Sequence, residues 1–207
     1  MKTIIIDYGM GNISSIRNML RYLGYSSVYS RDYQEIVSAD HLILPGVGNF
    51  GVAMDNIKSL GLNSILDEAV EVKRIPILGI CLGMQLMMTW SEEGSCAGLG
   101  WIEGEVRKFD FSTADLKIPH MGWDYIKQSQ KSRIFEGLPE SSRFYFVHSY
   151  YATCTNPDES LATTDYGGDF TSIIGRDNIY GVQFHPEKSH KFGMKILENF
   201  MRIKDVS

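Results

Sequence analysis

The strongest constraint on the fold of this chain is a buried strand that turns directly into a helix, with a cysteine at the turn. The apolar run Ile77–Ile80 leads into Cys81, and Gly79 and Gly83 lie two residues before and after it. This is the spacing of a nucleophile elbow, in which small residues let a strand bend sharply and expose the side chain at the bend. A thiol at a helix N-terminus is favoured as thiolate. The alternative is a buried structural cysteine on a core strand.

A second apolar strand, about a hundred residues later, carries the groups that a cysteine nucleophile needs. Residues 179–184 are followed by His185, Pro186 and Glu187. The histidine could take the thiol proton and later donate it to a leaving amine, and the carboxylate could hold the imidazole in the required tautomer. Such a base is usually far from its cysteine in sequence. A histidine that only ends the strand before Pro186 is the alternative, and the elbow favours the catalytic interpretation.

Together these two segments resemble a known family. Residues 76–85, Pro-Ile-Leu-Gly-Ile-Cys-Leu-Gly-Met-Gln, and residues 183–187, Gln-Phe-His-Pro-Glu, are similar to motifs of the class I, triad-type glutamine amidotransferases. Within that family the chain resembles the HisH group, the glutaminase subunits of imidazole glycerol phosphate synthase. The resemblance covers essentially all 207 residues. It implies one domain over residues 1–207 with an α/β, three-layer, flavodoxin-like fold. That fold has a largely parallel central sheet flanked by helices, and a smaller antiparallel sheet.

The resemblance also implies an activity and a partner. Cys81, His185 and Glu187 would form a catalytic triad that hydrolyses L-glutamine to glutamate and ammonia through a thioester. The ammonia would pass to a HisF-type (β/α)₈-barrel cyclase, the other half of a heterodimer, which makes imidazole glycerol phosphate and an aminoimidazole carboxamide ribonucleotide in histidine biosynthesis. Neither a cofactor nor a metal is expected. Two further interpretations stay open: a metal site built on the same three side chains, and a binding protein without catalytic activity.

Several further residues are expected around the glutamine. Three glycines in Pro45–Gly51 follow the apolar run His41–Leu44, where backbone amides could approach a ligand closely. The resemblance assigns the oxyanion hole to the amides of Gly48 and Leu82. Gln85 follows Cys81 by one helical turn, so it should share that face. By the resemblance, the glutamine contacts are Gly46, Gln85, Glu93, His148, Ser149 and Tyr150. The alternatives are a solvated Gln85 and Glu93, and a strand histidine at position 148.

The stretch Ile118–Asp124 places His, Met and Trp together, and Met and Trp are enriched at protein interfaces. A core tryptophan beside a turn is the alternative. The resemblance assigns the partner contact to His120, Met121, Trp123, Tyr145 and Lys188. The family's usual residue after the tryptophan is asparagine, whereas this chain has Asp124, which can only accept hydrogen bonds. This departure leaves a second client open, an amidotransferase that modifies surface-polysaccharide sugars.

Charge and cysteine content exclude other classes of protein. The net charge of −5 and pI near 5.5 argue against general binding to nucleic acid or anionic membranes. Three cysteines in 207 residues do not suggest a disulfide framework. An early Asp7 argues against a signal peptide, and no apolar run is long enough to span a membrane. A soluble cytoplasmic protein is therefore expected.

Local patterns predict further elements. The turn Gly9–Gly11 lacks the third glycine of a dinucleotide site, so we expect it to pack against a neighbouring loop. Asp32 and Glu35 have capping-box spacing. Ser189 is expected to cap the C-terminal helix. The remaining expectations are a helix over 62–73, a helix from Cys81 to about Met88, two short strands or a bent one over 100–109, and a hairpin through Gly167 and Gly168.

Overall fold

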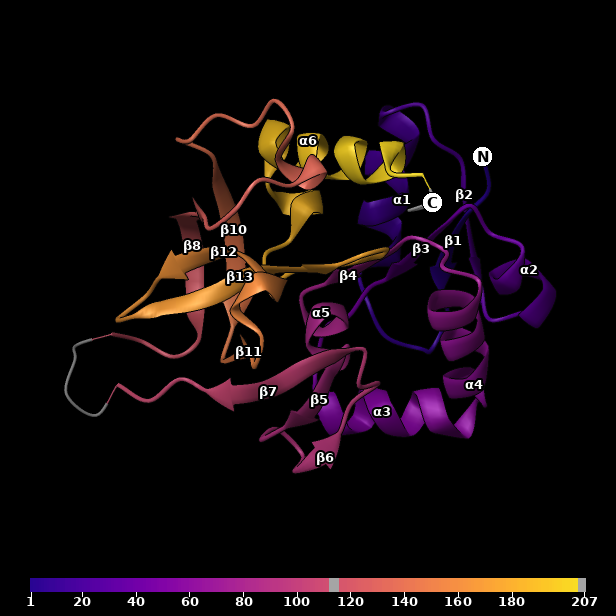
Figure 1. Ribbon diagram of the computed structural model, residues 1–207, viewed down its shortest axis with the longest axis horizontal. Helices are drawn as coiled ribbons and strands as arrows, with labels where there is room; N and C mark the ends of the chain where they lie inside the picture. Colours follow the sequence, from indigo (N-terminus) through magenta and orange to yellow (C-terminus); the bar gives the residue numbers. More distant parts are fainter. Residues whose placement is uncertain (112–115, 205–207) are drawn as a thin grey trace.

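The computed structural model describes residues 1–111 and 116–204, and in this part of the chain one large sheet runs through the molecule (Figure 1). Its first half is parallel throughout, because each strand in it runs in the same direction as its neighbours. In spatial order these strands are β2 (Ser27–Ser30), β1 (Thr3–Ile6), β3 (His41–Leu44), β4 (Ile77–Ile80) and β14 (Ile179–Val182). The elbow strand β4 therefore lies beside the strand that precedes His185.

The sheet continues beyond β14 with mostly antiparallel pairs. The strands there are β13 (Asp169–Arg176), β11 (Tyr150–Cys154), β7 (Ile102–Lys108), β5 (Met88–Ser91) and β6 (Cys96–Ala97), with β12 (Ser160–Asp165) and β9 (Lys127–Gln128) attached through β13. A separate antiparallel pair, β8 (His120–Tyr125) and β10 (Arg143–His148), forms the second sheet. The expected architecture, a largely parallel central sheet with a smaller antiparallel one, is confirmed.

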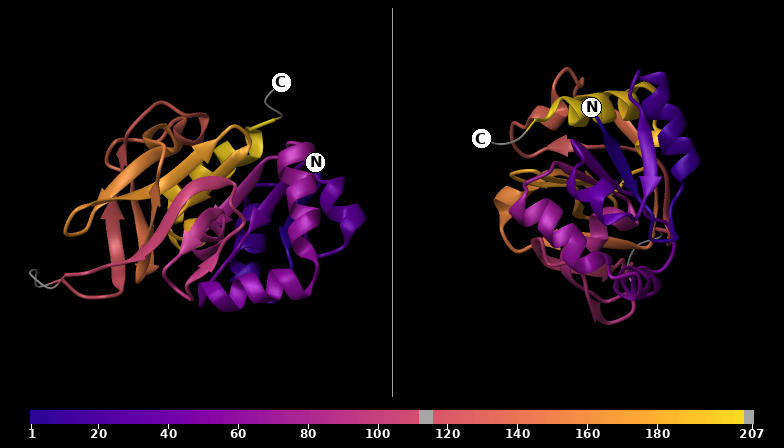
Figure 2. Two further views of the ribbon diagram at one scale, coloured as in Figure 1. Left: turned by 60° about the horizontal axis from the view of Figure 1, so that its bottom comes forward. Right: turned by 90° about the vertical axis from the view of Figure 1, so that its right-hand side faces the viewer.

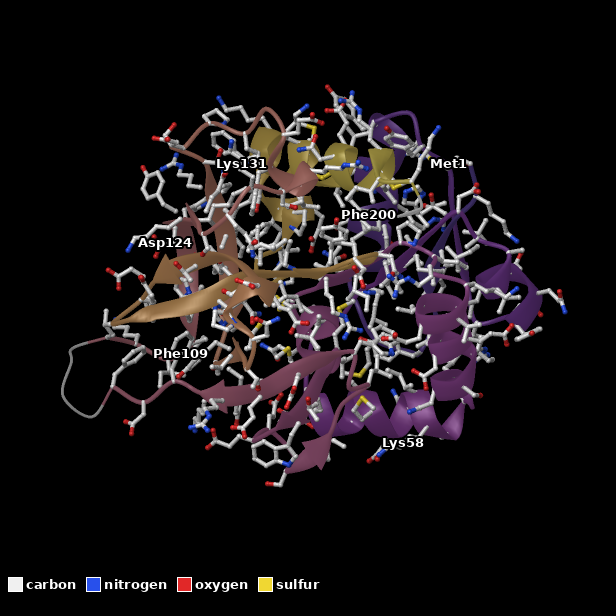
Figure 3. All side chains as sticks on the ribbon, in the orientation of Figure 1. Met1, Lys58, Phe109, Asp124, Lys131 and Phe200 are labelled. Atoms are coloured by element: carbon white, nitrogen blue, oxygen red, sulfur yellow. The ribbon has the colours of Figure 1, made fainter. Side chains whose placement is uncertain are left out.

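Helices cover both faces of the parallel half (Figures 1 and 2). One face carries α1 (Ile13–Tyr22) and α6 (His190–Arg202); the other carries α2 (Tyr33–Val37), α3 (Phe50–Ser59), α4 (Leu62–Asp67) and α5 (Leu82–Leu86). Two separate cores result, because side chains alternate across a strand: Ile4 and Ile6 join one core and Ile5 the other. Figure 3 shows how side chains such as Phe200 of α6 fill the space between the layers. The three-layer fold follows from the central strands β1, β3 and β4, which are buried at every position and mostly apolar.

Most of the local expectations are confirmed. The side chain of Asp32 accepts a hydrogen bond from the amide of Glu35 at 3.0 Å. A Cβ on Gly11 would lie 2.9 Å from the Pro45 side chain, so the first glycine turn packs against the next loop as expected. β12 and β13 pair as a hairpin across Gly167 and Gly168.

Three expectations about element bounds are wrong or incomplete. The helix after Cys81 ends at Leu86, because Met88–Ser91 forms β5 and pairs with β7. Residues 102–108 form one strand, with Gly104 at φ +151°. The helix expected over 62–73 is α4 followed by a π-helical turn over Glu68–Val72. Pairing with β6 and β7 outweighs local helical preference at β5.

Ser189 occupies the N-cap position of α6, but its side chain makes no capping hydrogen bond. Its hydroxyl instead donates to the carbonyl of His185 at 2.7 Å and accepts from the amide of Tyr145 at 3.0 Å. Ser189 therefore does not cap α6 with its side chain, and instead links β10 to the segment that carries His185.

Candidate active site

The elbow around Cys81 depends on its two glycines. Cys81 has φ +54° and ψ −109°, in the left-handed half of the Ramachandran map that L-residues rarely adopt. A Cβ on Gly83 would lie 1.8 Å from the carbonyl oxygen of Leu44, and one on Gly79 would lie 2.7 Å from the backbone of Gly83. No side chain fits at either position. The spacing of the motif is thus a steric requirement of the strand-to-helix bend, which holds Cys81 where β4 ends.

Strand pairing brings the histidine to the cysteine. Val182 of β14 pairs with Ile80 of β4, and the amide of Cys81 donates to the carbonyl of Val182 at 2.8 Å. His185 follows three residues later, and its side chain lies near enough to that of Cys81 for the two groups to interact. Its Nδ1 lies 2.8 Å from Oε1 of Glu187. The side chains of His185 and Glu187 are 2% and 1% exposed, so water barely weakens this contact.

The environment of His185 favours its protonated form. Burial alone would lower the pKa of this imidazole, but hydrogen bonds and charge from Cys81 and Glu187 outweigh burial and raise it to about 9. His185 therefore holds a proton at neutral pH. A cationic ring beside Cys81 favours a negatively charged sulfur. Nδ1 of His185 is directed at the carboxylate of Glu187, which leaves Nε2 as the ring nitrogen available to the sulfur of Cys81.

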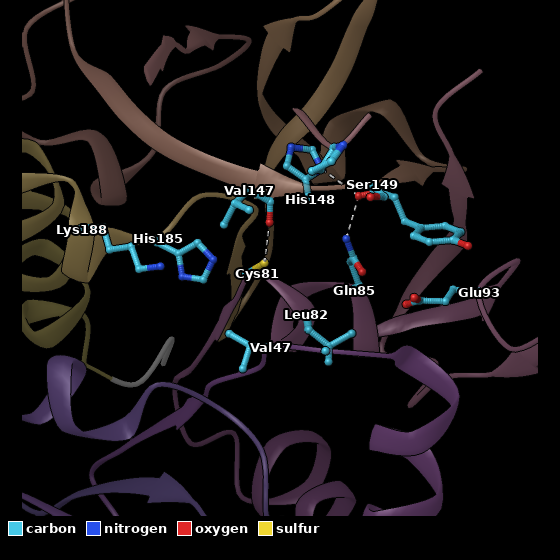
Figure 4. A pocket seen from close by; sticks show the side chains of 13 residues that line it. Val47, Cys81, Leu82, Gln85, Glu93, Val147, His148, Ser149, His185 and Lys188 are labelled. Atoms are coloured by element: carbon cyan, nitrogen blue, oxygen red, sulfur yellow. Dashed lines mark hydrogen bonds between the residues drawn. The ribbon is translucent and has the colours of Figure 1, made fainter. Parts of the chain in front are cut away.

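A cavity of about 370 Å³ opens in front of Cys81 (Figure 4). Its wall comes from six separate parts of the chain: Val47, Gly48, Cys81, Leu82, Gln85, Glu93, Pro119, Val147, His148, Ser149, Tyr150, His185 and Lys188. Both expected oxyanion residues, Gly48 and Leu82, lie on this wall, and Gly48 has φ +108°. Gly46 does not. A Cβ there would lie 2.7 Å from the amide nitrogen of Gly83, so Gly46 packs against the backbone of the elbow instead.

The two polar side chains expected to contact glutamine are both held in place. Gln85 is 4% exposed, and its Nε2 donates to the carbonyl of Tyr150 at 2.8 Å and to Oε1 of Gln183 at 2.9 Å. Because both N–H groups of the Gln85 amide are engaged in these bonds, its oxygen remains available to accept a hydrogen bond from a ligand. Glu93 accepts from the amide of Phe50 at 2.9 Å through Oε2. Neither residue is the freely solvated side chain of the alternative interpretation.

His148 differs from His185 although it borders the same cavity. The pKa of His148 is lowered to about 3, mainly by burial. The hydrogen bond to the Tyr150 carbonyl raises this pKa, whereas the nearby His120 and His185 lower it further. Its Nδ1 lies 2.8 Å from the oxygen of Tyr150, and its Nε2 lies 3.1 Å from Nδ1 of His120. Nε2 of His120 in turn lies 3.5 Å from Oδ2 of Asp124. His148 is a neutral, buried ring at neutral pH.

Comparison with known proteins supplies the family. The model of the family described as glutamine amidotransferase class-I matches residues 4–203. This chain is a class I glutamine amidotransferase.

Several relatives in this family are nearly full-length matches. A protein of Methanococcus maripaludis named imidazole glycerol phosphate synthase subunit HisH 2 is 54% identical over 96% of this chain and 98% of its own length. A HisH 2 subunit of Pseudomonas aeruginosa is 46% identical over 97% and 98%. The HisH subunit of Leptospira interrogans is 42% identical over 95% and 97%.

Solved structures with low sequence identity share the fold. PurLQS from Thermotoga maritima has a TM-score of 0.72 at 15% identity, covering 97% of both chains. The glutaminase domain of Trypanosoma brucei CTPS, solved with bound acivicin, has a TM-score of 0.64 at 14% identity, covering 100% of this chain and 96% of that one. The three-layer arrangement of this glutamine amidotransferase therefore persists at identities at which few side chains are shared.

The segment expected to contact a partner divides between surface and core. Met121 and Trp123 of β8 are 61% and 41% exposed, and Tyr125 is 55% exposed. The Trp123 ring stacks on His190 and lies under the guanidinium of Arg143, and Lys188 Nζ lies 5.6 Å from the ring centre of Tyr145. His120 is only 3% exposed and stacks between Phe146 and Tyr166. The expectation that His120 presents its side chain on this face is therefore wrong, because strand alternation turns it inward.

Other residues of the amidotransferase site were not expected from the sequence. Pro119, Val47 and Val147 line the cavity, and the carbonyl of Val147 lies 4.0 Å from the sulfur of Cys81. Gln183 is fully buried and lies 3.7 Å from that sulfur through Nε2. A signal for Gln183 was available: it is a polar residue within the otherwise apolar segment 179–184, and a buried amide needs partners.

Within the described ranges 1–111 and 116–204, no helix has the length and apolar character to cross a membrane, and no three His, Cys, Asp or Glu side chains converge as a metal-binding group.

Proposed function

We propose that this chain is a glutaminase subunit that hydrolyses L-glutamine to glutamate and ammonia and delivers the ammonia to a synthase. In the first step the sulfur of Cys81 attacks the side-chain carbonyl carbon of glutamine. The carbonyl oxygen becomes an oxyanion, for which the amides of Gly48 and Leu82 are the proposed donors. His185 gives its proton to the departing nitrogen, which leaves as ammonia, and a γ-glutamyl thioester remains on Cys81.

Water completes the cycle. His185, now neutral, takes a proton from a water molecule, whose oxygen attacks the thioester carbonyl. The carbon–sulfur bond breaks, glutamate is released, and the imidazolium and thiolate are restored. Glu187 supports both steps, because its bond to Nδ1 keeps Nε2 of His185 towards the reacting atoms. The observation that carries this proposal is the buried contact of His185 with both Cys81 and Glu187.

The proposed substrate contacts follow from the cavity. Glu93 would attract the α-ammonium group of glutamine, and the free oxygen of Gln85 would accept a hydrogen bond from the substrate. The backbone of Ser149 and Tyr150 would border the glutamine on the other side. A cavity of about 370 Å³ is of the size that small-ligand sites have.

The proposed receiver of the ammonia is a HisF-type (β/α)₈-barrel cyclase that makes imidazole glycerol phosphate and an aminoimidazole carboxamide ribonucleotide in histidine biosynthesis. Relatives at 42–54% identity are named as HisH subunits of imidazole glycerol phosphate synthase, which supports this assignment. Ammonia released into water would become ammonium, so delivery of ammonia to a synthase calls for a partner docked close to the cavity. Met121, Trp123, Tyr145 and Lys188 are the proposed contact residues.

The test uses the complex with a HisF-type cyclase. Cys81→Ala should abolish glutamine-dependent synthesis and leave synthesis fed by ammonium salts at the level of the unaltered complex. Glutamate release that persists in this variant would contradict the assignment of the nucleophile. Loss of both activities would point to a misassembled complex, which size-exclusion chromatography detects.

A second client remains a candidate because of Asp124. This carboxylate follows Trp123 on β8, and its side chain lies on the opposite face of the strand, 3.5 Å from Nε2 of His120; it cannot donate a hydrogen bond. An amidotransferase acting on surface-polysaccharide sugars would use the same ammonia chemistry. Identification of the protein that co-purifies with the native chain separates the two clients.

A further inference from the structure

We infer that the side-chain amide of Gln183 donates a hydrogen bond to the sulfur of Cys81 and stabilises its thiolate form, a role that rests on the function proposed above. Gln183 lies in the same motif as His185 but is neither acid, base nor part of the cavity wall. Its side chain is fully buried, and its Nε2 lies 3.7 Å from the sulfur.

The backbone fixes Gln183 beside the nucleophile. Its amide donates to the carbonyl of Ser172 on β13 at 2.9 Å, and the preceding residue, Val182, accepts from the amide of Cys81 at 2.8 Å. The strands on both sides of β14 therefore set the position of this side chain. A residue held in this way is preorganised, so the contact with sulfur costs little additional ordering.

The direction in which the amide points follows from a chain of three hydrogen bonds. It starts at the carbonyl of Tyr150, which can only accept, so the group of Gln85 that faces it is NH₂. The same NH₂ faces Gln183, whose nearest atom must then be the oxygen, at 2.9 Å. The NH₂ of Gln183 is thereby turned towards the sulfur of Cys81. One backbone carbonyl thus determines which end of Gln183 meets the nucleophile.

The fold offers the sulfur of Cys81 few other groups that could stabilise a negative charge. The helix that begins after Cys81 has only five residues, so few aligned peptide dipoles act on the sulfur. The titratable groups that face Cys81 are His185, from the segment after β14, and Tyr8, from the end of β1. Tyr8 is a neutral phenol whose hydroxyl donates to the carbonyl of Pro45 at 2.5 Å, because burial raises its pKa. Among the described side chains, Gln183 therefore offers the sulfur a neutral donor, beside the imidazole of His185.

The test measures thiolate reactivity directly. The full chain is treated with iodoacetamide between pH 5 and 9, and the rate at Cys81 is obtained by peptide mass spectrometry, with Cys96 as an internal reference. Gln183→Met keeps the length of the side chain and removes the donor; we expect the half-maximal rate of alkylation at Cys81 to move up by about one pH unit, and the rate at pH values below that midpoint to fall about tenfold. Gln183→Glu, which replaces the donor by a carboxylate, should give a larger loss. Thr164→Val, which removes a buried hydroxyl that has no hydrogen-bond partner within the described part of the chain and does not line the cavity, is the control.

Alkylation profiles of Gln183→Met and Gln183→Glu that stay within twofold of the unaltered chain would overturn the inference. If a variant does not fold, NMR of the unaltered chain decides: the side-chain NH₂ resonances of Gln183 should move with the same pH midpoint as the alkylation rate, and resonances that do not move contradict the inference. If Cys81 of the unaltered chain reacts no faster than Cys96, the proposed function itself fails, which is a separate outcome.

Discussion

Two histidines border one cavity and have opposite proton affinities. His185 follows β14 and His148 ends β10, and both are buried. The pKa of His185 is raised to about 9, whereas that of His148 is lowered to about 3. The difference comes from their partners: His185 meets a carboxylate and a thiol, and His148 meets a carbonyl and a second histidine. Burial beside a negative group therefore raises the pKa of a histidine, and burial without such a group lowers the pKa, so that the ring is neutral.

The largest expected effect comes from making the same change on both sides of the cavity. Asparagine keeps a donor near the Nδ1 position and removes Nε2. His185→Asn should lower kcat for glutamine hydrolysis by about 10³-fold or more, because the acid and base are lost. His148→Asn is the matched control and should lower kcat by less than about tenfold. Steady-state kinetics in the complex measures both, and equal losses would mean that the two rings share the proton transfer.

The second prediction tests whether Glu187 causes the difference in pKa between His185 and His148. Glu187→Gln keeps the shape and removes the negative charge, so the pKa of His185 should fall towards its ordinary value. We expect kcat at neutral pH to fall by about 10²-fold. The alkaline limb of the pH–rate profile, which lies near pH 9 if His185 titrates there, should move to lower pH. An unchanged limb would show that Cys81 alone sustains the imidazolium.

Stability should depend on pH in opposite ways at the two sites. Between pH 3 and 6.5, His148 binds a proton in the unfolded chain but not in the folded one. Acidification through this range therefore lowers the free energy of unfolding, by at most about 1.4 kcal/mol per pH unit. Between pH 6.5 and 9 folded His185 holds a proton that the unfolded chain releases, so its contribution is full below 6.5 and is lost as pH rises through 9. Urea unfolding at a series of pH values measures both. His148→Asn should flatten the acid side and His185→Asn the alkaline side.

The smallest expected effect concerns Asp124. Three contacts in a row join the Tyr150 carbonyl, His148, His120 and Asp124, and each requires one proton. Two neutral imidazoles supply two protons, and burial lowers the pKa of His120 although Asp124 partly opposes this. Asp124→Asn supplies a donor for the third contact. It should stabilise the fold at neutral pH by up to about 1 kcal/mol, measured by urea unfolding. A destabilised variant would show that the 3.5 Å contact of Asp124 with His120 is already satisfied.

The sequence predicted those features that depend on local sterics or on long motifs. Gly79 and Gly83 gave the elbow because no Cβ fits there, and apolar strands gave the layered sheet. The helix after Cys81 was expected to be too long, because β5 forms through pairing with β7, which local preference cannot reveal. His120 was assigned to the surface because Ile118–Asp124 was not treated as a strand; alternation along β8 buries it and exposes Met121.

The role of Gln183 could not be found in the same way. Its partners Gln85 and Cys81 are 98 and 102 residues away, and only the register of β14 against β4 brings them within hydrogen-bonding distance. A buried polar residue can be recognised from the pattern, but not which atoms satisfy it.

The position of β14 in the middle of the sheet also determines when the contacts of Cys81 can form during synthesis of the chain. The nucleophile is synthesised early, yet the strand that supplies its base is inserted between β4 and β13 only after residues 179–187 have emerged. Until then the left-handed cysteine has neither proton donor nor carboxylate beside it. An unfinished chain without residues 179–187 therefore lacks the contacts of His185 and Glu187 on which the proposed hydrolysis of glutamine depends.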